Sequence, residues 1–265
     1  MNTERYNKVS IGVITDIHYS ESEGIGNRCY RDSLSKVRQA VETFNHEKPS
    51  FCINLGDLID NDQTLDDEIS NLKAVEREYA KFNGERHYVL GNHDLAGFSK
   101  EQFFGICLTK GRYYSFDCVG FHFIILDACY NEDESEYNKG NFDWIETYMP
   151  IAEQEWLESD LKNTDKRTFI FIHQRLDDEN DVHGVKNGFG VRKIIEKSGK
   201  VFVVFQGHDH RGGYAFVDGI HYFTFRAIVE GSGLENNAYS LIHIDEESVY
   251  IEGFGNQISA ELTDF

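Results

Sequence analysis

Histidine, aspartate and asparagine side chains follow five short apolar runs of the sequence, each at the point where the run ends. The clearest case is the segment QGHDHRGG (206–213), in which His208 and His210 come directly after the apolar run 201–205. Side chains two residues apart in an extended segment point the same way, so both imidazoles can aim at one point. The neighbouring glycines allow a sharp turn of the backbone there. Because imidazole is a common metal ligand, this segment indicates a bound ion.

The other four apolar runs end in the same kinds of side chain. The run 9–14 leads into Asp16 and His18, 51–55 into Asp57 and Asp60, 88–90 into Asn92, His93 and Asp94, and 169–172 into His173. One aspartate after a strand is usually a turn or helix-capping residue, so no single block decides the matter. Five separate strand ends of this kind are not explained by turn chemistry. We assign no role in the site to His122 and His221, which lie inside alternating strands.

The candidate ligands are imidazoles, carboxylates and one amide, without a thiolate. They are Asp16, His18, Asp57, Asn92, His173, His208 and His210. Mixed nitrogen and oxygen ligands favour manganese, iron or zinc over an all-oxygen calcium site. Seven ligands are too many for one tetrahedral zinc ion, but they suit two ions about 3.5–4 Å apart that share a carboxylate, an arrangement used for phosphoryl hydrolysis. We therefore expect two divalent transition metal ions, manganese first and iron or zinc as alternatives.

Short apolar runs alternate with amphipathic stretches, which predicts β-α-β units followed by a β-meander. We expect strands at 9–14, 51–55, 87–90, 113–116, 121–126, 169–172, 201–205, 214–217, 221–226, 239–244 and 249–253, and helices at 30–45, 65–82, 154–161 and 191–196. A hairpin turn is expected at Val119–Gly120. In open α/β sheets the ligand site lies outside the carboxyl ends of the strands, so the polar blocks can converge there. We expect two sheets flanked by helices, in a single domain over residues 1–265.

Composition limits the classes of partner. The formal net charge is −20, which disfavours tight binding to nucleic acid or to an anionic membrane, so an anionic substrate must find its positive charge locally. The five cysteines show no C-x-x-C spacing and are expected to be reduced, mostly buried thiols, which suits the cytoplasm. We see no signal-peptide core or membrane-spanning run, and no obligate protein partner is evident. The acidic segments 131–136 and 177–181 are most simply solvated loops. Alternatively, they are loops that border the site.

The ordered blocks D-x-H, G-D-x-x-D, G-N-H-D, a lone histidine and G-H-D-H resemble the calcineurin-like metallophosphoesterases over roughly residues 9–210. The resemblance implies an α/β fold, a four-layer α-β-β-α sandwich with two central mixed sheets. It also implies that one metal is held by Asp16, His18, Asp57 and His210, and the other by Asp57, Asn92, His173 and His208. It further implies that His93 is the catalytic histidine, oriented by Asp60, while Asp94 supports the loop.

Three longer segments are similar to the manganese-dependent ADP-ribose/CDP-alcohol diphosphatases: CYRDSLSKVRQAVETFN (29–45), EQEWLESDL (153–161), and GHDHRGG (207–213) with DGIHYFTFRAIVEG (218–231). The stretch 175–190 departs from that subfamily. The similarity implies a nucleoside-diphosphate-linked small molecule, cut at its phosphoanhydride by a metal-bound hydroxide.

Arginines near the blocks are candidates to hold a second phosphate, chiefly Arg31 and Arg211, with Arg28 and Arg175 also near. Tyr19 or Phe189 is a candidate to stack on a base. The alternatives are a broad phosphomonoesterase, a phosphodiesterase for small cyclic nucleotides, and, in another class, a non-catalytic scaffold of the same fold.

Overall fold

Two six-stranded sheets lie at the centre of the molecule. The structure, a computed structural model, describes residues 8–61 and 64–263. The first sheet has the order β12-β11-β10-β1-β2-β3. Its strands are β1 (Val9–Ile14), β2 (Phe51–Asn54), β3 (Glu85–Tyr88), β10 (Ala238–Ile244), β11 (Ser248–Gly255) and β12 (Ala260–Thr263). Because β1, β2 and β3 run parallel while β10, β11 and β12 pair antiparallel, this sheet is mixed.

The second sheet is also mixed, with the order β4-β5-β6-β7-β9-β8. Its strands are β4 (Tyr114–Cys118), β5 (Phe121–Ile125), β6 (Thr168–Phe171), β7 (Val201–Gln206), β8 (Gly213–Val217) and β9 (Ile220–Thr224). The four inner strands run parallel, and β4 and β8 pair antiparallel at the two edges. The predicted hairpin turn at Val119–Gly120 is confirmed, with φ values of 47° and 86° that suit a tight two-residue turn.

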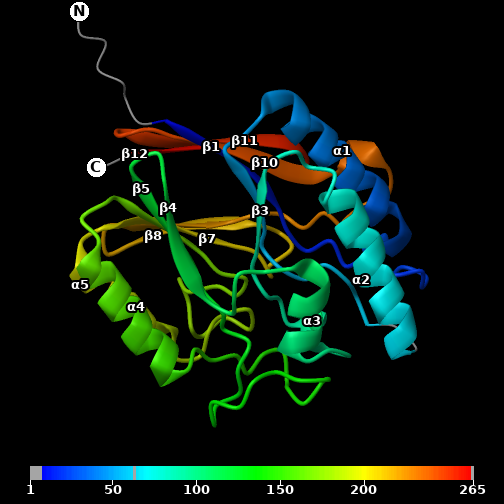
Figure 1. The fold of residues 1–265 in the computed structure, drawn as a ribbon, viewed down its shortest axis with the longest axis horizontal. Coiled ribbons are helices and arrows are strands. Elements are labelled where there is room, and N and C mark those ends of the chain that lie inside the picture. Colours follow the sequence, from blue (N-terminus) through cyan, green and yellow to red (C-terminus); the bar gives the residue numbers. More distant parts are fainter. Residues whose placement is uncertain (1–7, 62–63, 264–265) are drawn as a thin grey trace, which may run out of the picture.

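Helices cover the outer face of each sheet (Figure 1). They are α1 (Ser33–Glu47), α2 (Leu65–Tyr79), α3 (Lys100–Cys107), α4 (Ile151–Asn163) and α5 (Gly188–Ser198), with 3₁₀ turns η1 (Tyr30–Asp32), η2 (His93–Leu95) and η3 (Leu234–Asn236). Phe44 of α1 and Leu72 of α2 pack against the first sheet, whereas Leu157 of α4 and Val191 of α5 pack against the second. The predicted α-β-β-α order of layers is thereby confirmed.

Alternation along each strand places apolar side chains in two layers at once. In β1, Ile11 and Val13 enter the cluster between the two sheets, while Ile14 enters the cluster beneath α1 and α2. Phe51 of the first sheet meets Phe123 of the second with ring centroids 5.2 Å apart. Each such fully buried side chain contributes about 1.5–3 kcal/mol to folding. The strands are therefore fixed in register, and so are the loops that follow them.

Helix α3 and strand β12 were not predicted from the sequence, and neither were the 3₁₀ turns η2 and η3. The predicted helices and strands are all present, with ends that differ by a few residues. All five cysteines are free thiols; Cys52, Cys107 and Cys129 are buried as expected, whereas Cys29 and Cys118 are partly exposed. Within residues 8–61 and 64–263, no helix has the length and apolar character needed to cross a membrane.

His122 joins the β4–β5 hairpin to α4 through two carboxylates. Its Nδ1 lies 2.7 Å from Asp117 and its Nε2 lies 2.8 Å from Asp160. Burial opposes the charged imidazole, but the hydrogen bonds to Asp160 and Asp117 outweigh burial and raise the pKa of His122 above its usual value. A histidine whose pKa is raised by folding stabilises the fold fully below its unfolded pKa, and this contribution is lost as the pH rises through the folded pKa.

We therefore expect His122→Gln to lower the free energy of unfolding more at about pH 6 than at about pH 9, by roughly 1 kcal/mol. Urea unfolding of the variant and the parent at both pH values measures the difference. His243→Gln is the matched control, because His243 is paired with Glu252 at 3.3 Å on the exposed surface, where such pairs contribute little. Equal losses for His122→Gln at the two pH values would contradict the assignment.

Candidate active site

The predicted ligand blocks converge where parallel strands of both sheets end. Asp16, Asp57 and Asn92 follow β1, β2 and β3 of the first sheet, and His173 and His208 follow β6 and β7 of the second. Backbone hydrogen bonds tie neighbouring loops together: Asp16 N–H donates to the carbonyl of Gly56 at 3.0 Å, and Gly207 N–H donates to that of His173 at 2.9 Å. The loops of the two sheets are joined to each other by the His208 N–H, which donates to Oδ2 of Asp16 at 3.1 Å.

The backbone is strained at four of these residues. Asp16, His18, Asp57 and His208 have φ values of 50°, 45°, 54° and 67°, in the left-handed region that residues other than glycine rarely adopt. Each such residue costs about 1–3 kcal/mol, and the conformation persists only where the surroundings enforce it. Strain at four candidate ligands indicates that these turns are shaped for a site.

Two glycines allow the loops to approach these carboxylates. A Cβ atom on Gly91 would lie 2.2 Å from Oδ1 of Asp57, and one on Gly207 would lie 2.4 Å from Oγ1 of Thr15 and 2.8 Å from Oδ2 of Asp16. All three distances are shorter than a Cβ atom tolerates, so a side chain at either position would displace its neighbours. The glycines of the G-N-H-D and G-H-D-H blocks therefore have a structural reason beyond the turn itself.

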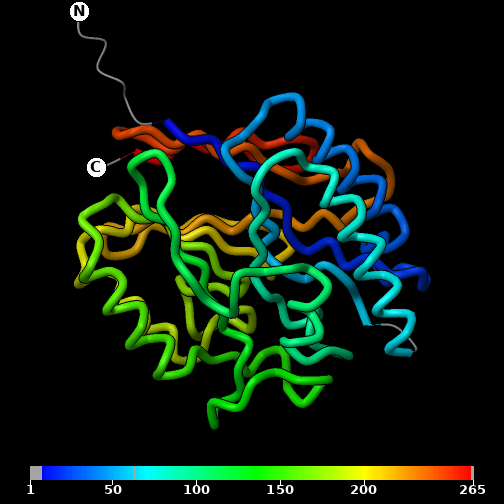
Figure 2. The backbone as a smooth tube through the Cα atoms, viewed as in Figure 1, coloured from blue at the N-terminus to red at the C-terminus, as the bar shows by residue number. Residues whose placement is uncertain are grey.

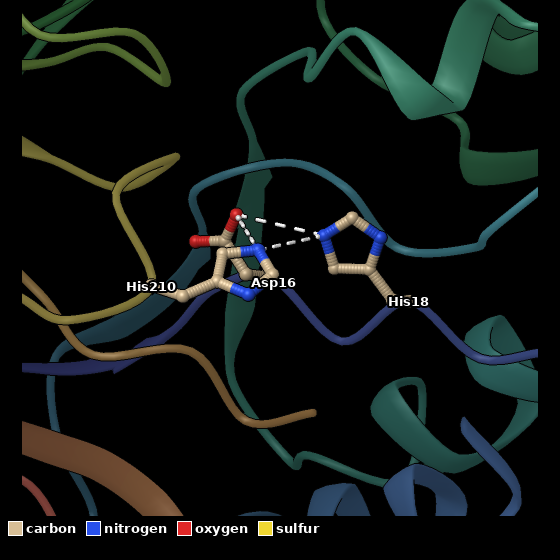
Figure 3. Close-up of side chains that lie close together, drawn as sticks. All are labelled: Asp16, His18 and His210. Atoms are coloured by element: carbon tan, nitrogen blue, oxygen red, sulfur yellow. Dashed lines mark hydrogen bonds and ion pairs between the residues drawn. The ribbon is translucent and has the colours of Figure 1, made fainter. Parts of the chain in front are cut away.

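Asp16, His18 and His210 form the first cluster (Figure 3). The two Nε2 atoms of His18 and His210 are 3.1 Å apart, and they lie 3.8 Å and 3.6 Å from Oδ1 of Asp16. Oδ2 of Asp16 accepts hydrogen bonds from the Thr15 hydroxyl and the His208 N–H, which leaves Oδ1 aimed at the imidazoles. Such a group of nitrogen and oxygen atoms can hold one metal ion.

Asp57, His173 and His208 form the second cluster. Oδ2 of Asp57 is 3.2 Å from Nε2 of His173 and 3.4 Å from Nε2 of His18, so this one oxygen lies between the two clusters. Four buried atoms of the candidate ligands have no hydrogen-bond partner: Oδ1 of Asp16, Oδ1 of Asn92, Nε2 of His173 and Nε2 of His208. A buried polar atom without a partner is costly, and divalent cations would satisfy all four. The residues present therefore fit two metal ions.

Three of the histidines are oriented through their Nδ1 atoms. Nδ1 lies 2.8 Å from the Leu55 carbonyl in His173, 2.7 Å from Glu230 in His210, and 3.1 Å from Asp60 in His18. An acceptor at Nδ1 holds the proton there and leaves the Nε2 lone pair free for a metal. In each of these rings it is Nε2 that faces the carboxylates of the clusters.

The charges of the clusters shift the pKa values of their members. Burial opposes protonation of His18, but its interactions with Asp16 and Asp60 raise the pKa of His18 to about 10. Burial also opposes protonation of His173, yet the charge of Asp57 raises the pKa of His173 to about 9. Burial alone would raise the pKa of Asp57, but the positive charges of His173 and His93 hold it well below its usual range. Concentrated negative charge of this kind attracts cations.

His93 stands at the rim of the clusters. Its side chain is 24% exposed, and its ring lies edge-on to that of His18 with centroids 4.6 Å apart. Oδ1 of Asp60 is 3.3 Å from Nδ1 of His93, while Oδ2 of the same carboxylate is 3.1 Å from Nδ1 of His18. The backbone N–H of His93 donates to Oδ1 of Asp57 at 2.8 Å. A partly exposed imidazole beside a buried charge cluster has the access that proton transfer requires.

Asp94 connects the loops that follow β2 and β3. Its carboxylate accepts hydrogen bonds from the backbone N–H groups of Asp57, Leu58 and Gly91, at 2.9, 2.8 and 3.0 Å. Burial and the charge of Asp57 raise the pKa of Asp94 to about 7. The side chain is fully buried, so it cannot meet a substrate. It holds Asp57 in its strained conformation.

We expect Asp94→Ala to lower the free energy of unfolding by at least about 3 kcal/mol, because three buried donors lose their acceptor at roughly 1–3 kcal/mol each. Urea unfolding measures the loss. Asp133→Ala is the control: Asp133 also accepts a backbone N–H, that of Ser135, but it is exposed, so no measurable loss is expected. Comparable values for the two variants would contradict the role given to Asp94.

The arginines predicted near the blocks differ in what they contact. Nη1 of Arg28 lies 3.6 Å from Oδ2 of Asp60, at the edge of the clusters. Arg31 is exposed, and its Nε donates to the carbonyl of Glu21 at 2.7 Å. Of these two, Arg28 is the one in contact with a residue of the site, although Arg31 remains a candidate for a second phosphate.

Arg175 and Arg211 both contact Asp209, which lies between the two histidines of the G-H-D-H block. Arg211 has a side chain that is 76% exposed and pairs with Asp209 at 2.8 Å. Arg175 pairs with Asp177, Asp181 and Asp209 at 2.6, 3.3 and 3.4 Å. Three carboxylates neutralise Arg175, so it orders the acidic segment 177–181 beside the site. Arg211 has a highly exposed side chain that pairs with one carboxylate, so it stays a candidate for phosphate binding.

The prediction that Tyr19 could stack on a base is wrong. Its ring belongs to the core beneath α1 and α2, and its hydroxyl donates to Glu21. Phe189 is 56% exposed on α5, where its ring lies near Arg192 and Lys193.

Two residues of the site were missed in the sequence. Glu230 orients His210, and Trp144 lies with its ring centroid 5.6 Å from that of His208. Neither stands beside a ligand block in the sequence.

Comparison with known proteins agrees with this geometry. The calcineurin-like phosphoesterase family matches residues 9–212. The manganese-dependent ADP-ribose/CDP-alcohol diphosphatase of Arabidopsis thaliana is 28% identical over 284 residues, with 89% of this chain and 90% of that protein covered. The protein of the same name from Xenopus tropicalis is 25% identical, with 93% and 91% covered. Among solved structures, a dimetal phosphatase from Danio rerio gives a TM-score of 0.86 at 21% identity, with 97% of this chain and 99% of that chain covered.

The solved structure has the same fold, which confirms the predicted sandwich of two mixed sheets. The family match includes every block that carries a candidate ligand, from Asp16 to His210. The prediction of a metallophosphoesterase is confirmed at the level of the family. The chain belongs to the calcineurin-like phosphoesterase family.

Proposed function

We propose that this protein is a dinuclear manganese hydrolase that cleaves the phosphoanhydride of nucleoside-diphosphate-linked small molecules, such as ADP-ribose or a CDP-alcohol. The observation that carries the proposal is the position of Asp57, whose Oδ2 lies 3.4 Å from His18 of one cluster and 3.2 Å from His173 of the other. A carboxylate shared in this way is the usual bridge of a two-metal phosphoryl site. The relatives named as manganese-dependent diphosphatases support the choice of metal and of substrate.

Asp16, His18, Asp57 and His210 would hold one ion, and Asp57, Asn92, His173 and His208 the other. Two bound divalent ions supply positive charge for the phosphate oxygens and lower the pKa of a water molecule toward neutrality. His93 is placed at the rim to give a proton to the leaving oxygen or to hold its charge. Asp60, whose Oδ1 lies 3.3 Å from Nδ1 of His93, would orient the imidazole ring.

Positive charge from the protein is scarce, since the chain carries a formal net charge of −20. Arg28, in contact with Asp60, and the exposed Arg31 and Arg211 are the candidates to bind the second phosphate of the substrate. A substrate with two phosphates uses these arginines, whereas a simple phosphomonoester does not. This difference favours the diphosphatase over the broad phosphomonoesterase.

Comparison of kcat/KM for ADP-ribose, CDP-choline, a 2′,3′-cyclic nucleotide and an aryl monophosphate, each with added manganese, tests the proposal. We expect one of the two diphosphate compounds to give the highest value. A tenfold advantage for the aryl monophosphate or the cyclic nucleotide would overturn the diphosphatase assignment and leave the two-metal site in place. No turnover of any of the four, in protein that contains metal, would favour the non-catalytic scaffold.

The remaining features stay predictions. A small phosphorylated metabolite or nucleotide as the ligand, rather than nucleic acid or a membrane, is supported by the acidic net charge. The cytoplasmic location rests on five free cysteines.

A further inference from the structure

We propose that the indole ring of Trp144 stacks on the planar base of the nucleotide, a role that rests on the proposed function. Trp144 is 43% exposed although tryptophan is highly buried on average. Its ring lies edge-on to that of His208 with centroids 5.6 Å apart, and 5.8 Å from the ring of His183. A large aromatic ring is thus presented to solvent directly beside the second cluster.

The loop that carries Trp144 is held in place by contacts of the buried Tyr137. This segment runs between β5 and α4, in green along the lower edge of Figure 2. Tyr137 is fully buried and stacks on Phe142, with ring centroids 4.0 Å apart and planes 9° apart. The Tyr137 hydroxyl donates to the carbonyls of Asp143 and Glu146, at 3.3 and 3.0 Å. Because the turn is ordered before a ligand arrives, little conformational entropy is lost when a base binds.

Trp144 shares a pocket with residues of the site. The pocket has a volume of ≈ 390 Å³ and is lined by Asn92 and His93 on the side of the clusters and by Phe142, Asp143 and Trp144 on the side of the loop. This volume lies within the range of small-molecule sites. A substrate with its phosphate at the clusters can therefore place an attached group against the indole ring.

The chemistry of this pocket suits a base better than a second phosphate. Among the described residues that line it there is an aspartate, Asp143, and neither lysine nor arginine. The pocket beside His210, of ≈ 410 Å³, is lined by two arginines, Arg211 and Arg226, and by one carboxylate, Glu230, which is paired with His210. Anionic groups are therefore expected on the His210 side. Stacking of a base on an aromatic ring needs no positive charge and is worth about 1–3 kcal/mol per base.

Tryptophan fluorescence tests the proposal without relying on turnover, because the chain contains two tryptophans. In Trp156→Phe, Trp144 is the only fluorophore of its kind; in the matched control Trp144→Phe, only Trp156 of α4 remains. We expect AMP to quench the first variant in a saturable manner and to leave the second unchanged, with metal-loaded protein excited at the red edge of tryptophan absorption. Ribose 5-phosphate, which lacks the base, is expected to quench neither.

Affinity measured by calorimetry completes the test. Trp144→Ala is expected to weaken AMP binding by roughly 5- to 150-fold, Trp144→Phe to retain most of the affinity, and both to bind ribose 5-phosphate like the parent. Equal quenching by ribose 5-phosphate, AMP binding without quenching in Trp156→Phe, or unchanged AMP affinity in Trp144→Ala would overturn the stacking role. The diphosphatase assignment is judged separately, by the comparison of substrates, so that either proposal can fail while the other stands.

Discussion

Replacement of Asp57 by asparagine is expected to remove most of the bound metal and to lower kcat/KM by roughly 10³-fold or more. Asp57 is the residue whose carboxylate lies between both clusters, and its Oδ1 also accepts the N–H of His93 at 2.8 Å. Metal ions supply several kcal/mol of charge stabilisation in such sites, and each 1.36 kcal/mol corresponds to a factor of ten in rate. Elemental analysis after gel filtration gives the metal content per chain, and turnover of ADP-ribose gives the rate.

Two further variants show whether the loss of metal and activity is specific to Asp57, the carboxylate that lies between the two clusters. Asp16→Asn changes a carboxylate of the first cluster and is expected to reduce metal content less than Asp57→Asn. Asp117→Asn changes a carboxylate with a 52% exposed side chain, paired with His122 and Lys166, and is expected to keep both metals. An Asp57→Asn protein with two metals and full activity, or a parent protein that remains active in excess chelator, would refute the two-metal site.

The candidate ligands could be predicted from the sequence because each belongs to a local unit. A buried parallel strand must end at the edge of its sheet, and the residues one to three positions later must lie at that edge. Asp16, Asp57 and His208 each follow their strand within three residues, so hydrophobic periodicity alone placed them. The strained φ values of these three residues were not visible in the sequence, because their cost is met by the packing of two separate sheets.

The residues that the sequence did not reveal act across long separations in the chain. Glu230 orients His210 from 20 residues away, and Trp144 reaches His208 from a loop attached to another strand. Arg28 reaches Asp60, while Arg31, three residues later in the same segment, turns to Glu21. Spacing along the chain cannot distinguish these cases, because the direction of each side chain is set by its tertiary contacts.

Helix α3 carries a local sequence signal at its N-terminus. It begins with a capping box in which Ser99 and Gln102 bond reciprocally, a pattern that is visible in the sequence. Its first residue, Lys100, is buried and pairs with Asp127 at 2.6 Å. A lysine at that position favours a solvent-exposed reading, and Gly105 interrupts the apolar stripe. The ion pair between Lys100 and Asp127 could not be predicted from the sequence, whereas the capping box by itself predicts a helix at this position.

His93→Ala is expected to keep both metals and to lower kcat by roughly 10²–10⁴-fold, the usual loss for an acid–base group. The metals should remain because His93 contacts Asp57 through its backbone N–H, which alanine retains. The imidazole itself contacts Asp60 at 3.3 Å and the ring of His18, and its exposed part faces the pocket that also contains Asn92. Elemental analysis and steady-state kinetics on the same preparation separate the two effects.

A comparison of good and poor leaving groups shows whether His93 donates a proton or only stabilises negative charge. A p-nitrophenolate departs with little protonation, and so does a phosphate monoester, because both are weak bases. A sugar alkoxide is a strong base and needs much more protonation, so loss of a general acid should slow this poor leaving group far more than a good one. Asp60→Asn should show a milder form of the same pattern, because it weakens the orientation of His93 without removing the ring. Equal losses for both leaving groups would exclude proton donation and assign His93 to stabilising the charge of the transition state, since that charge develops whichever group departs.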